Sequence, residues 1–306
     1  MQIVLLYPPP WKIAPDGNPP YPPGEGPPAD TNTAAANSGD FIQIPYGLLS
    51  LAAQALHAGE DVRVFNLANF PWPVIEGLIA HLDADLFGLS CMTGNRRGTA
   101  MLAALIRAVH PGARIVVGGP HATALPLEML QHVPAIDTVV IGEGEQTFAE
   151  IIAYRKKNKP LKDIPGTAWR DGLRCRLGPP RDPIEHLDAL VSPLDYFDLG
   201  TVMTSRGCPM HCTFCSSTGM WGPRPRFHSV EYVLRELETA VCRHGRRMLS
   251  IKDDTFTAHR SRTLAICEGI RQRGLEFIWS CDTRVDCLDD ELLAAMRRAG
   301  CVRISL

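Results

Sequence analysis

The sequence predicts an α/β protein with two units, each built on a parallel β-sheet. Short runs rich in Val, Ile and Leu alternate with stretches whose apolar residues recur at helical spacing. A proline-rich stretch near the middle interrupts this alternation, which then resumes. With 306 residues, 45% of them apolar, the chain is long enough for two medium-sized domains.

The first predicted domain spans residues 1–160. Its expected strands are 2–7, 61–66, 85–90, 113–117 and 137–141, and its expected helices are 46–57, 97–110 and 145–158. Gly59 and Pro111 mark two of the helix ends. This order predicts a doubly wound parallel sheet. Ten prolines between Pro8 and Pro28 exclude a helix directly after the first strand. This proline-rich stretch is interpreted either as a lid over a ligand or as a solvated loop.

Residues 161–197 are rich in proline and predict a linker with a small hairpin at 167–177, which turns at Asp171 and Gly172. The second domain, 198–306, has expected strands near 199–205, 248–252, 276–281 and 302–306. Helices are expected near 229–244, 260–273 and 289–299. The chain ends within the last strand pattern, and we expect it to be a fragment or truncated form of a longer protein.

The composition argues against several classes of function. The formal net charge of −2 gives no reason to expect nucleic acid or an anionic membrane as a partner. No apolar run approaches the roughly 18 residues of a membrane span, and the first residues have no signal-peptide pattern. A cytoplasmic protein is expected. Ten cysteines in a reducing compartment favour metal ligation over disulfides.

Three cysteines form the most specific motif in the chain. Cys208, Cys212 and Cys215 have the spacing C-x3-C-x2-C, directly after a predicted strand. Three clustered thiolates suit an iron–sulfur cluster. A zinc site would need a fourth ligand, and His211 lies between two of the cysteines, where it would be strained. The other cysteines have no ligand spacing and are expected in the core: Cys91, Cys175, Cys242, Cys267, Cys281, Cys287 and Cys301.

At these residues the sequence resembles the radical S-adenosylmethionine (SAM) superfamily, whose motif has an aromatic residue before the third cysteine, here Phe214. The resemblance implies a [4Fe–4S] cluster held by Cys208, Cys212 and Cys215, with one iron open to SAM. That iron allows reductive cleavage of SAM to a 5′-deoxyadenosyl radical. The resemblance also implies a partial (β/α) TIM-like barrel, of which this chain would hold about four of six βα units, truncated at its C-terminal end.

Four residues are expected to contact SAM by the same resemblance. Phe214 belongs to the cysteine motif, and Asp253 and Asp254 match a segment that contacts the amino end of SAM. Arg284 matches an arginine near the cofactor. Two solvated acids capping the next helix and a surface arginine are the alternatives for these positions.

Three small, polar loops follow the later strands of the first domain. They contain Ser90 and Thr93, then Gly118, Gly119 and His121, then Gly142, Glu143 and Gly144. Glycines there let a ligand approach the backbone. A dinucleotide fingerprint does not fit, because Gly142-x-Gly144 follows the fifth strand and Thr147 stands in place of the third glycine.

These loops, with residues 46–52 of the first helix, resemble the cobalamin (B12)-binding domain that precedes the radical domain in one class of these enzymes. The resemblance implies a Rossmann-like or flavodoxin-like fold and a base-off corrinoid contacted by all three loops. The Asp-x-His-x-x-Gly motif of His-on proteins is absent, so no histidine is expected to ligate cobalt. For His121, a loop-capping role is preferred over cobalt ligation.

Together the resemblances imply a cobalamin-dependent radical SAM enzyme that transfers a methyl group to an unactivated carbon. They imply a small-molecule or natural-product substrate and a low-potential electron donor. A radical cyclase or rearrangement enzyme of the same architecture is one alternative. A non-catalytic module that binds a corrinoid or zinc is another.

Overall fold

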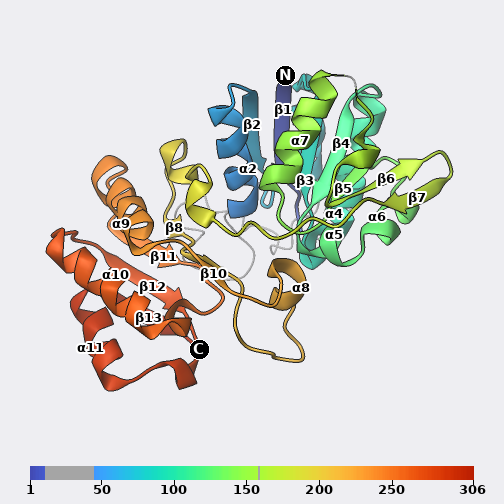
Figure 1. Cartoon of the computed structure of the whole chain (residues 1–306). Helices are drawn as coiled ribbons and strands as arrows, with labels where there is room; N and C mark the ends of the chain where they lie inside the picture. Colours follow the sequence, from blue (N-terminus) through green and yellow to red (C-terminus); the bar gives the residue numbers. More distant parts are fainter. Residues whose placement is uncertain (11–44, 158) are drawn as a thin grey trace, which may run out of the picture. The chain divides into compact units, whose positions relative to one another are not determined.

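Figure 1 shows the computed structural model of the chain, which describes residues 1–10, 45–157 and 159–306. The chain divides into two compact units, Met1–Asp182 and Pro183–Leu306. Most of the predicted proline-rich loop lies outside the described residues.

The described residues of the first unit form a seven-stranded sheet with the order β2-β1-β3-β4-β5-β6-β7. Strands β1 to β5 are parallel, and β6 and β7 are antiparallel. All of β1 after Gln2 is buried, as expected of an apolar strand covered on both faces. The strands are β1 (Gln2–Tyr7), β2 (Asp61–Asn66), β3 (Leu86–Ser90), β4 (Arg114–Gly118), β5 (Thr138–Val140), β6 (Thr167–Asp171) and β7 (Arg174–Leu177).

Helices cover both faces of this sheet. One core cluster joins α3 and α4 to the face of β1 that carries Val4 and Leu6. On the opposite face α2 packs against α7 (Figure 1). The helices are α2 (Tyr46–His57), α3 (Trp72–His81), α4 (Arg96–Val109), α5 (Pro120–Ala124), α6 (Pro126–His132) and α7 (Glu145–Lys156). The doubly wound sheet is confirmed, whereas α3, α5 and α6 were not predicted.

The strand order reverses at β1, which has β2 on one side and β3 on the other. In open parallel sheets, ligands bind in the crevice outside the carboxyl ends of the strands at such a switch point. The loops that follow β3, β4 and β5 belong to that edge of the sheet, which makes them the candidate ligand-binding loops of this unit.

The predicted hairpin forms with its turn at Gly172, which has a φ of 60°. It is part of the first sheet and not of a separate linker, because β6 pairs antiparallel with β5. This pairing satisfies backbone groups of β5 that an edge strand would leave open. Residues after Asp182 belong to the second unit, where Ile184, Leu187 and Leu194 are buried.

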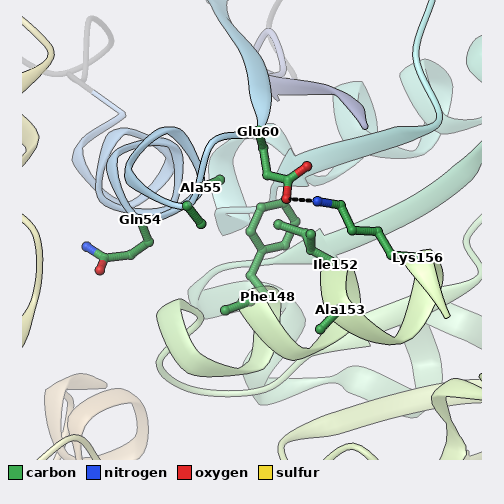
Figure 2. Close-up of a pocket in the computed structure, with 9 residues that line it drawn as sticks. Gln54, Ala55, Glu60, Phe148, Ile152, Ala153 and Lys156 are labelled. Atoms are coloured by element: carbon green, nitrogen blue, oxygen red, sulfur yellow. Dashed lines mark hydrogen bonds and ion pairs between the residues drawn. The ribbon is translucent and has the colours of Figure 1, made fainter.

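A buried carboxylate lies between α2 and α7 at the start of β2. Glu60 accepts hydrogen bonds from Lys156 Nζ and, at 3.2 Å, from the amino group of Met1, and its side chain is 4% exposed. Figure 2 shows Glu60 and Lys156 beside the apolar side chains of Phe148 and Ile152. Burial raises the pKa of Glu60, but the two cations outweigh it and hold that pKa below its usual value.

We expect Lys156→Met to destabilise the first unit by about 1–3 kcal/mol at neutral pH, because Glu60 keeps its charge but loses a partner. A carboxylate with a depressed pKa stabilises the fold above its unfolded pKa and ceases to do so as pH falls through the folded pKa. The difference from the wild type should therefore shrink near pH 3. Urea unfolding at both pH values measures it, with the neighbouring exposed Lys157→Met as control. An equal loss in the two variants would contradict the role of the pair.

The second unit is built on a four-stranded parallel sheet with the order β13-β12-β11-β8. Helices α9, α10 and α11 alternate with its strands, and this sequential βα order is that of a (β/α) barrel. The sheet strands are β8 (Thr201–Val202), β11 (Met248–Ile251), β12 (Ile278–Asp282) and β13 (Cys301–Ser305), and the helices are α9 (Val230–Glu238), α10 (Arg260–Gln272) and α11 (Asp290–Arg298).

Smaller elements surround this sheet. Strand β9 (Ser205–Arg206) pairs antiparallel with β10 (Arg226–Phe227), and α8 (Ser217–Trp221) lies between them in sequence. The predicted helix 229–244 ends as a π-helical turn, Thr239–Arg243. Trp279 anchors the core, packs edge-on against Phe256 and donates from Nε1 to Ala299 O at 2.8 Å. Within the described residues, no helix combines the length and apolar composition needed to cross a membrane.

Candidate functional site

The three motif cysteines lie on one loop between β9 and α8. Gly207 starts this loop with a φ of 85°, a conformation that favours glycine. Cys208 and Cys212 are half-buried, and Cys215 is exposed. His211, the alternative zinc ligand, is exposed. The thiols are therefore accessible on a loop that follows the first strands of the second unit.

Side chains from two further loops contact the thiols. Thr255 Oγ1, after β11, lies 3.2 Å from Cys208 Sγ. Arg284, after β12, donates from Nη1 to Cys212 Sγ at 3.5 Å. The loops after three strands of the sheet therefore meet at their carboxyl ends, where (β/α) barrels carry their active sites.

The donor set fits an iron–sulfur cluster. Among the described residues, no three His, Cys, Asp or Glu side chains surround one point where a single ion could bind. A [4Fe–4S] cluster does not require three thiolates on one ion, because each thiolate binds a different iron. Ligation by cysteine thiolates is the usual arrangement for these clusters. The hydrogen bond from Arg284 to Cys212 would also offset the negative charge of a bound cluster.

The adjacent acids predicted to contact SAM have different surroundings. Asp253 is 3% exposed, and its carboxylate accepts hydrogen bonds from Thr204 N at 2.6 Å and Ser205 N at 3.1 Å. Burial raises its pKa, while these hydrogen bonds and Arg262 oppose that rise. Asp254 is exposed and accepts a hydrogen bond from Ser217 Oγ. Only Asp254 is thus presented to solvent, and SAM contact by either acid stays a prediction.

Arg284 and Phe214 complete the predicted SAM contacts. Arg284 forms a bidentate ion pair with Asp286, at 2.7 and 2.9 Å, which raises the pKa of Arg284. The pair leaves Nη1 directed at Cys212. This contact favours a role for Arg284 at the cysteine loop over the alternative of a surface arginine. Phe214 is 91% exposed, and its contact with SAM stays a prediction.

Two residues around the cysteine loop were not predicted. Thr255 and Arg262 carry no motif signal, although Arg262 is only 8% exposed and donates to Thr204 O at 2.8 Å. The expectation that the other seven cysteines are core residues holds for Cys91, Cys267, Cys281 and Cys301. It is wrong for the exposed Cys242, whereas Cys175 is half-buried and packs against the core cluster, and Cys287 is half-buried.

A neutral histidine supports the start of α9. His228 is 7% exposed, stacks on Tyr232 with 4.0 Å between ring centroids, and donates from Nδ1 to Asp188 at 2.9 Å. Burial lowers the pKa of His228 to about 4, helped by the nearby Arg206 and Arg262 and opposed by Asp188. The folded unit therefore keeps His228 uncharged throughout the neutral range.

We expect the second unit to lose up to about 3 kcal/mol of stability between pH 6.5 and pH 4, because the unfolded chain protonates His228 there and the folded one does not. The stabilisation is present above the unfolded pKa and is lost as pH falls through the folded pKa. His228→Asn should flatten the pH dependence of urea unfolding, and the exposed His186→Asn should not. An unchanged pH profile in His228→Asn would contradict this assignment.

The predicted corrinoid-binding loops of the first unit form one hydrogen-bonded edge. Cys91 N, after Ser90, donates to Gly118 O at 2.7 Å, and His121 N donates to Cys91 O at 3.0 Å. Gly142 N donates to Thr123 Oγ1 at 3.0 Å. The loops after β3, β4 and β5 are therefore brought together as expected for a shared ligand.

Individual side chains of this edge have distinct roles. His121 Nδ1 hydrogen-bonds Thr93 Oγ1 at 3.2 Å, so it links two loops, and burial lowers its pKa. Glu143 is 8% exposed. Gly144 precedes Glu145, whose carboxylate accepts a hydrogen bond from Ser50 of α2 at 2.8 Å. Corrinoid contact by these residues stays a prediction.

Each of the two units contains a segment that matches the model of a known family. Residues 33–152 match the family model of the B12 binding domain, and residues 202–306 match that of the radical SAM superfamily. The first match includes the three glycine-containing loops, and the second includes the cysteine loop.

Individual proteins are similar along most of the chain. An uncharacterized methyltransferase of Pyrococcus horikoshii is 33% identical over 272 residues, which are 84% of this chain and 59% of the relative. The anaerobic magnesium-protoporphyrin IX monomethyl ester cyclase of Rubrivivax gelatinosus is 29% identical over 247 residues, 74% of this chain and 44% of the relative. The chain spans about half the length of the curated relatives it matches.

A solved structure shows the same fold. The radical SAM methyltransferase TsrM of Kitasatospora setae, with tryptophan and a SAM analogue bound, superposes with a TM-score of 0.74 over 99% of this chain and 58% of TsrM. The identity is 17%, so this likeness concerns the fold. Another structure of TsrM contains cobalamin and a [4Fe–4S] cluster.

Proposed function

The chain belongs to the radical SAM superfamily, in the class with a B12-binding domain before the radical SAM domain, and we propose that its whole protein is a cobalamin-dependent radical SAM methyltransferase. The observation that carries the proposal is the cysteine loop, with Thr255 on Cys208 and Arg284 on Cys212 at the carboxyl end of the sheet. The methyltransferase relative from Pyrococcus horikoshii supports the reaction class.

The residues present fit the cofactors of the class. Cys208, Cys212 and Cys215 would hold a [4Fe–4S] cluster, and the loops at Ser90–Thr93, Gly118–His121 and Gly142–Glu145 would hold a base-off corrinoid. When bound, these groups supply an electron for SAM cleavage and a methyl group for transfer to an unactivated carbon. Phe214, Asp254 and Arg284 are the proposed SAM contacts, whereas the buried Asp253 would position the cysteine loop beside them.

The chain's own side chains would position and tune these groups. Arg284 donates to the Cys212 sulfur and is held in place by Asp286. Hydrogen bonds to cluster sulfurs tune the reduction potential. Exposed Asp254 would accept hydrogen bonds from the ammonium group of SAM. His121, already hydrogen-bonded to Thr93, would shape the corrinoid loop and not ligate cobalt.

We further propose a small-molecule substrate, a low-potential electron donor and a cytoplasmic location. None of the ten cysteines is in a disulfide, which suits a reducing compartment. The small-molecule substrate named for the Rubrivivax gelatinosus cyclase supports the substrate class.

The test is iron analysis and electron paramagnetic resonance of the whole protein purified without oxygen, with and without SAM. About four irons per chain and a signal that shifts with SAM are expected. Added hydroxocobalamin should bind one per chain. Zinc without iron, or no corrinoid binding, would overturn the proposal.

A radical cyclase is the second candidate, favoured by the similarity to the magnesium-protoporphyrin IX monomethyl ester cyclase. The mass of the product discriminates between the two. Methyl transfer adds about 14 daltons to the substrate, whereas ring formation or rearrangement does not. A turnover product without the added mass would overturn the methyltransferase proposal in favour of the cyclase.

A further inference from the structure

The segment after β11 contacts the cysteine loop at its start, at its first thiol and at its end. Asp253 accepts hydrogen bonds from the backbone of Thr204 and Ser205, just before the loop. Thr255 Oγ1 lies 3.2 Å from Cys208 Sγ. Asp254 accepts a hydrogen bond from Ser217, which follows the third cysteine. Three consecutive residues thus contact both ends of the loop and its first thiol.

Arg262 of α10 holds the same starting point through other atoms. Its guanidinium donates to Thr204 O at 2.8 Å and Thr204 Oγ1 at 3.2 Å, and also to His228 O at 3.1 and 3.0 Å. The hydroxyl of Thr204 in turn donates to Asp253 Oδ2. Thr204 itself is fully buried. A buried anion and a buried cation therefore share one threonine, and each hydrogen-bonds both its backbone and its hydroxyl.

The burial of Asp253 argues against direct contact with a ligand. Both of its carboxylate oxygens accept hydrogen bonds from the chain, and the residue is 3% exposed. Burying a carboxylate is costly unless it is hydrogen-bonded and its charge is compensated, and here both conditions hold. The neighbouring Asp254 is exposed and is the acid that a ligand can reach.

We propose that Asp253, Thr204 and Arg262 form a lock that positions the cysteine loop for cluster binding. Asp253 and Arg262 are positioning residues that act through Thr204 and Ser205, and Asp254 is the member of the acidic pair left to contact a ligand. That the cysteine loop binds a [4Fe–4S] cluster rests on the proposed function. The lock itself is a property of the chain without its cofactors.

Hydrogen exchange of the whole protein, free of metal, tests the lock directly. In Asp253→Asn the amide nitrogen cannot accept the proton of the Thr204 hydroxyl, and the charge that faces Arg262 is lost. We expect exchange in peptides spanning 203–216 to be at least about tenfold faster than in the wild type. Asp282→Asn is the matched control, because Asp282 lies at the carboxyl end of the neighbouring strand β12 and pairs with Lys252 instead of the cysteine loop. Unchanged exchange in Asp253→Asn, or an equal change in both variants, would overturn the lock.

A pair of threonine variants separates positioning from general loss of structure. Thr204→Ser keeps the hydroxyl and should exchange as the wild type does, whereas Thr204→Val removes the hydroxyl and should behave as Asp253→Asn. Peptides of β12 and β13 should stay protected in all variants. Equal behaviour of the serine and valine variants, or loss of protection in β12 and β13, would overturn the assignment.

Iron retention links the lock to the proposed function. After anaerobic reconstitution, Asp253→Asn and Thr204→Val should release iron to a chelator several-fold faster than the wild type and Thr204→Ser. Iron release at the wild-type rate despite faster hydrogen exchange would overturn the positioning role. A wild-type protein that takes up no iron would overturn the proposed function. The hydrogen-exchange result would still support the lock, because it is measured without metal.

Discussion

Alanine at Cys208, Cys212 or Cys215, introduced singly, is expected to reduce bound iron from about four atoms per chain to below one and to abolish SAM cleavage. Each thiolate would bind a different iron, so two remaining thiolates cannot retain a stable cluster. Iron and sulfide analysis after anaerobic reconstitution, together with chromatography of the SAM cleavage products, measures both losses.

Cys242→Ala is the matched control for these variants. Cys242 is exposed on the π-helical turn after α9, away from the motif in sequence, and its replacement should leave the iron content unchanged. Full iron content in any of the three motif variants would show that the motif does not ligate the cluster.

Gly119→Ala is expected to destabilise the first unit by about 3 kcal/mol and to weaken corrinoid binding at least tenfold. Gly119 has a φ of 103°, and a Cβ there would lie 2.9 Å from Cys91 O and 3.1 Å from Cys91 N. Both atoms belong to the backbone, so neither can move without breaking the hydrogen bonds that join the loops after β3 and β4. Urea unfolding and titration with hydroxocobalamin measure the two effects.

Gly94→Ala provides the control in the same region. A Cβ at Gly94 meets nothing within 4 Å, and its φ lies outside the left-handed range. This variant should match the wild type within about 0.5 kcal/mol. Similar losses in both variants would contradict a steric requirement for glycine at position 119.

The first unit shows where local sequence is sufficient and where it is not. The bounds of β1, β2 and α2 match the prediction, because each is a continuous apolar or amphipathic run between clear breakers. Helix α3 was missed since Pro71 and Pro73 flank its first residue, Trp72, and resemble a loop in sequence. Proline is in fact tolerated in the first turn of a helix, where its missing N–H has no partner to lose.

The candidate site likewise has some features that local sequence predicts and others that it does not. The cysteine spacing predicted the loop and the family because it is a local pattern. The different surroundings of Asp253 and Asp254 could not be predicted, since the two acids are adjacent and equivalent in sequence. The partner of Asp253, Thr204, is 49 residues away, and the contact of Arg262 with Thr204 spans 58 residues. Only tertiary packing decides which acid is buried.

Charged side chains lie on both outer strands of the sheet that the described residues of the first unit form. At one edge β2 carries Asp61 and Arg63, and at the other β7 carries Arg174 and Arg176. Charged side chains on short edge strands oppose the addition of a strand from a neighbouring chain. The arginines of the antiparallel hairpin therefore oppose aggregation through the open backbone groups of its edge strand.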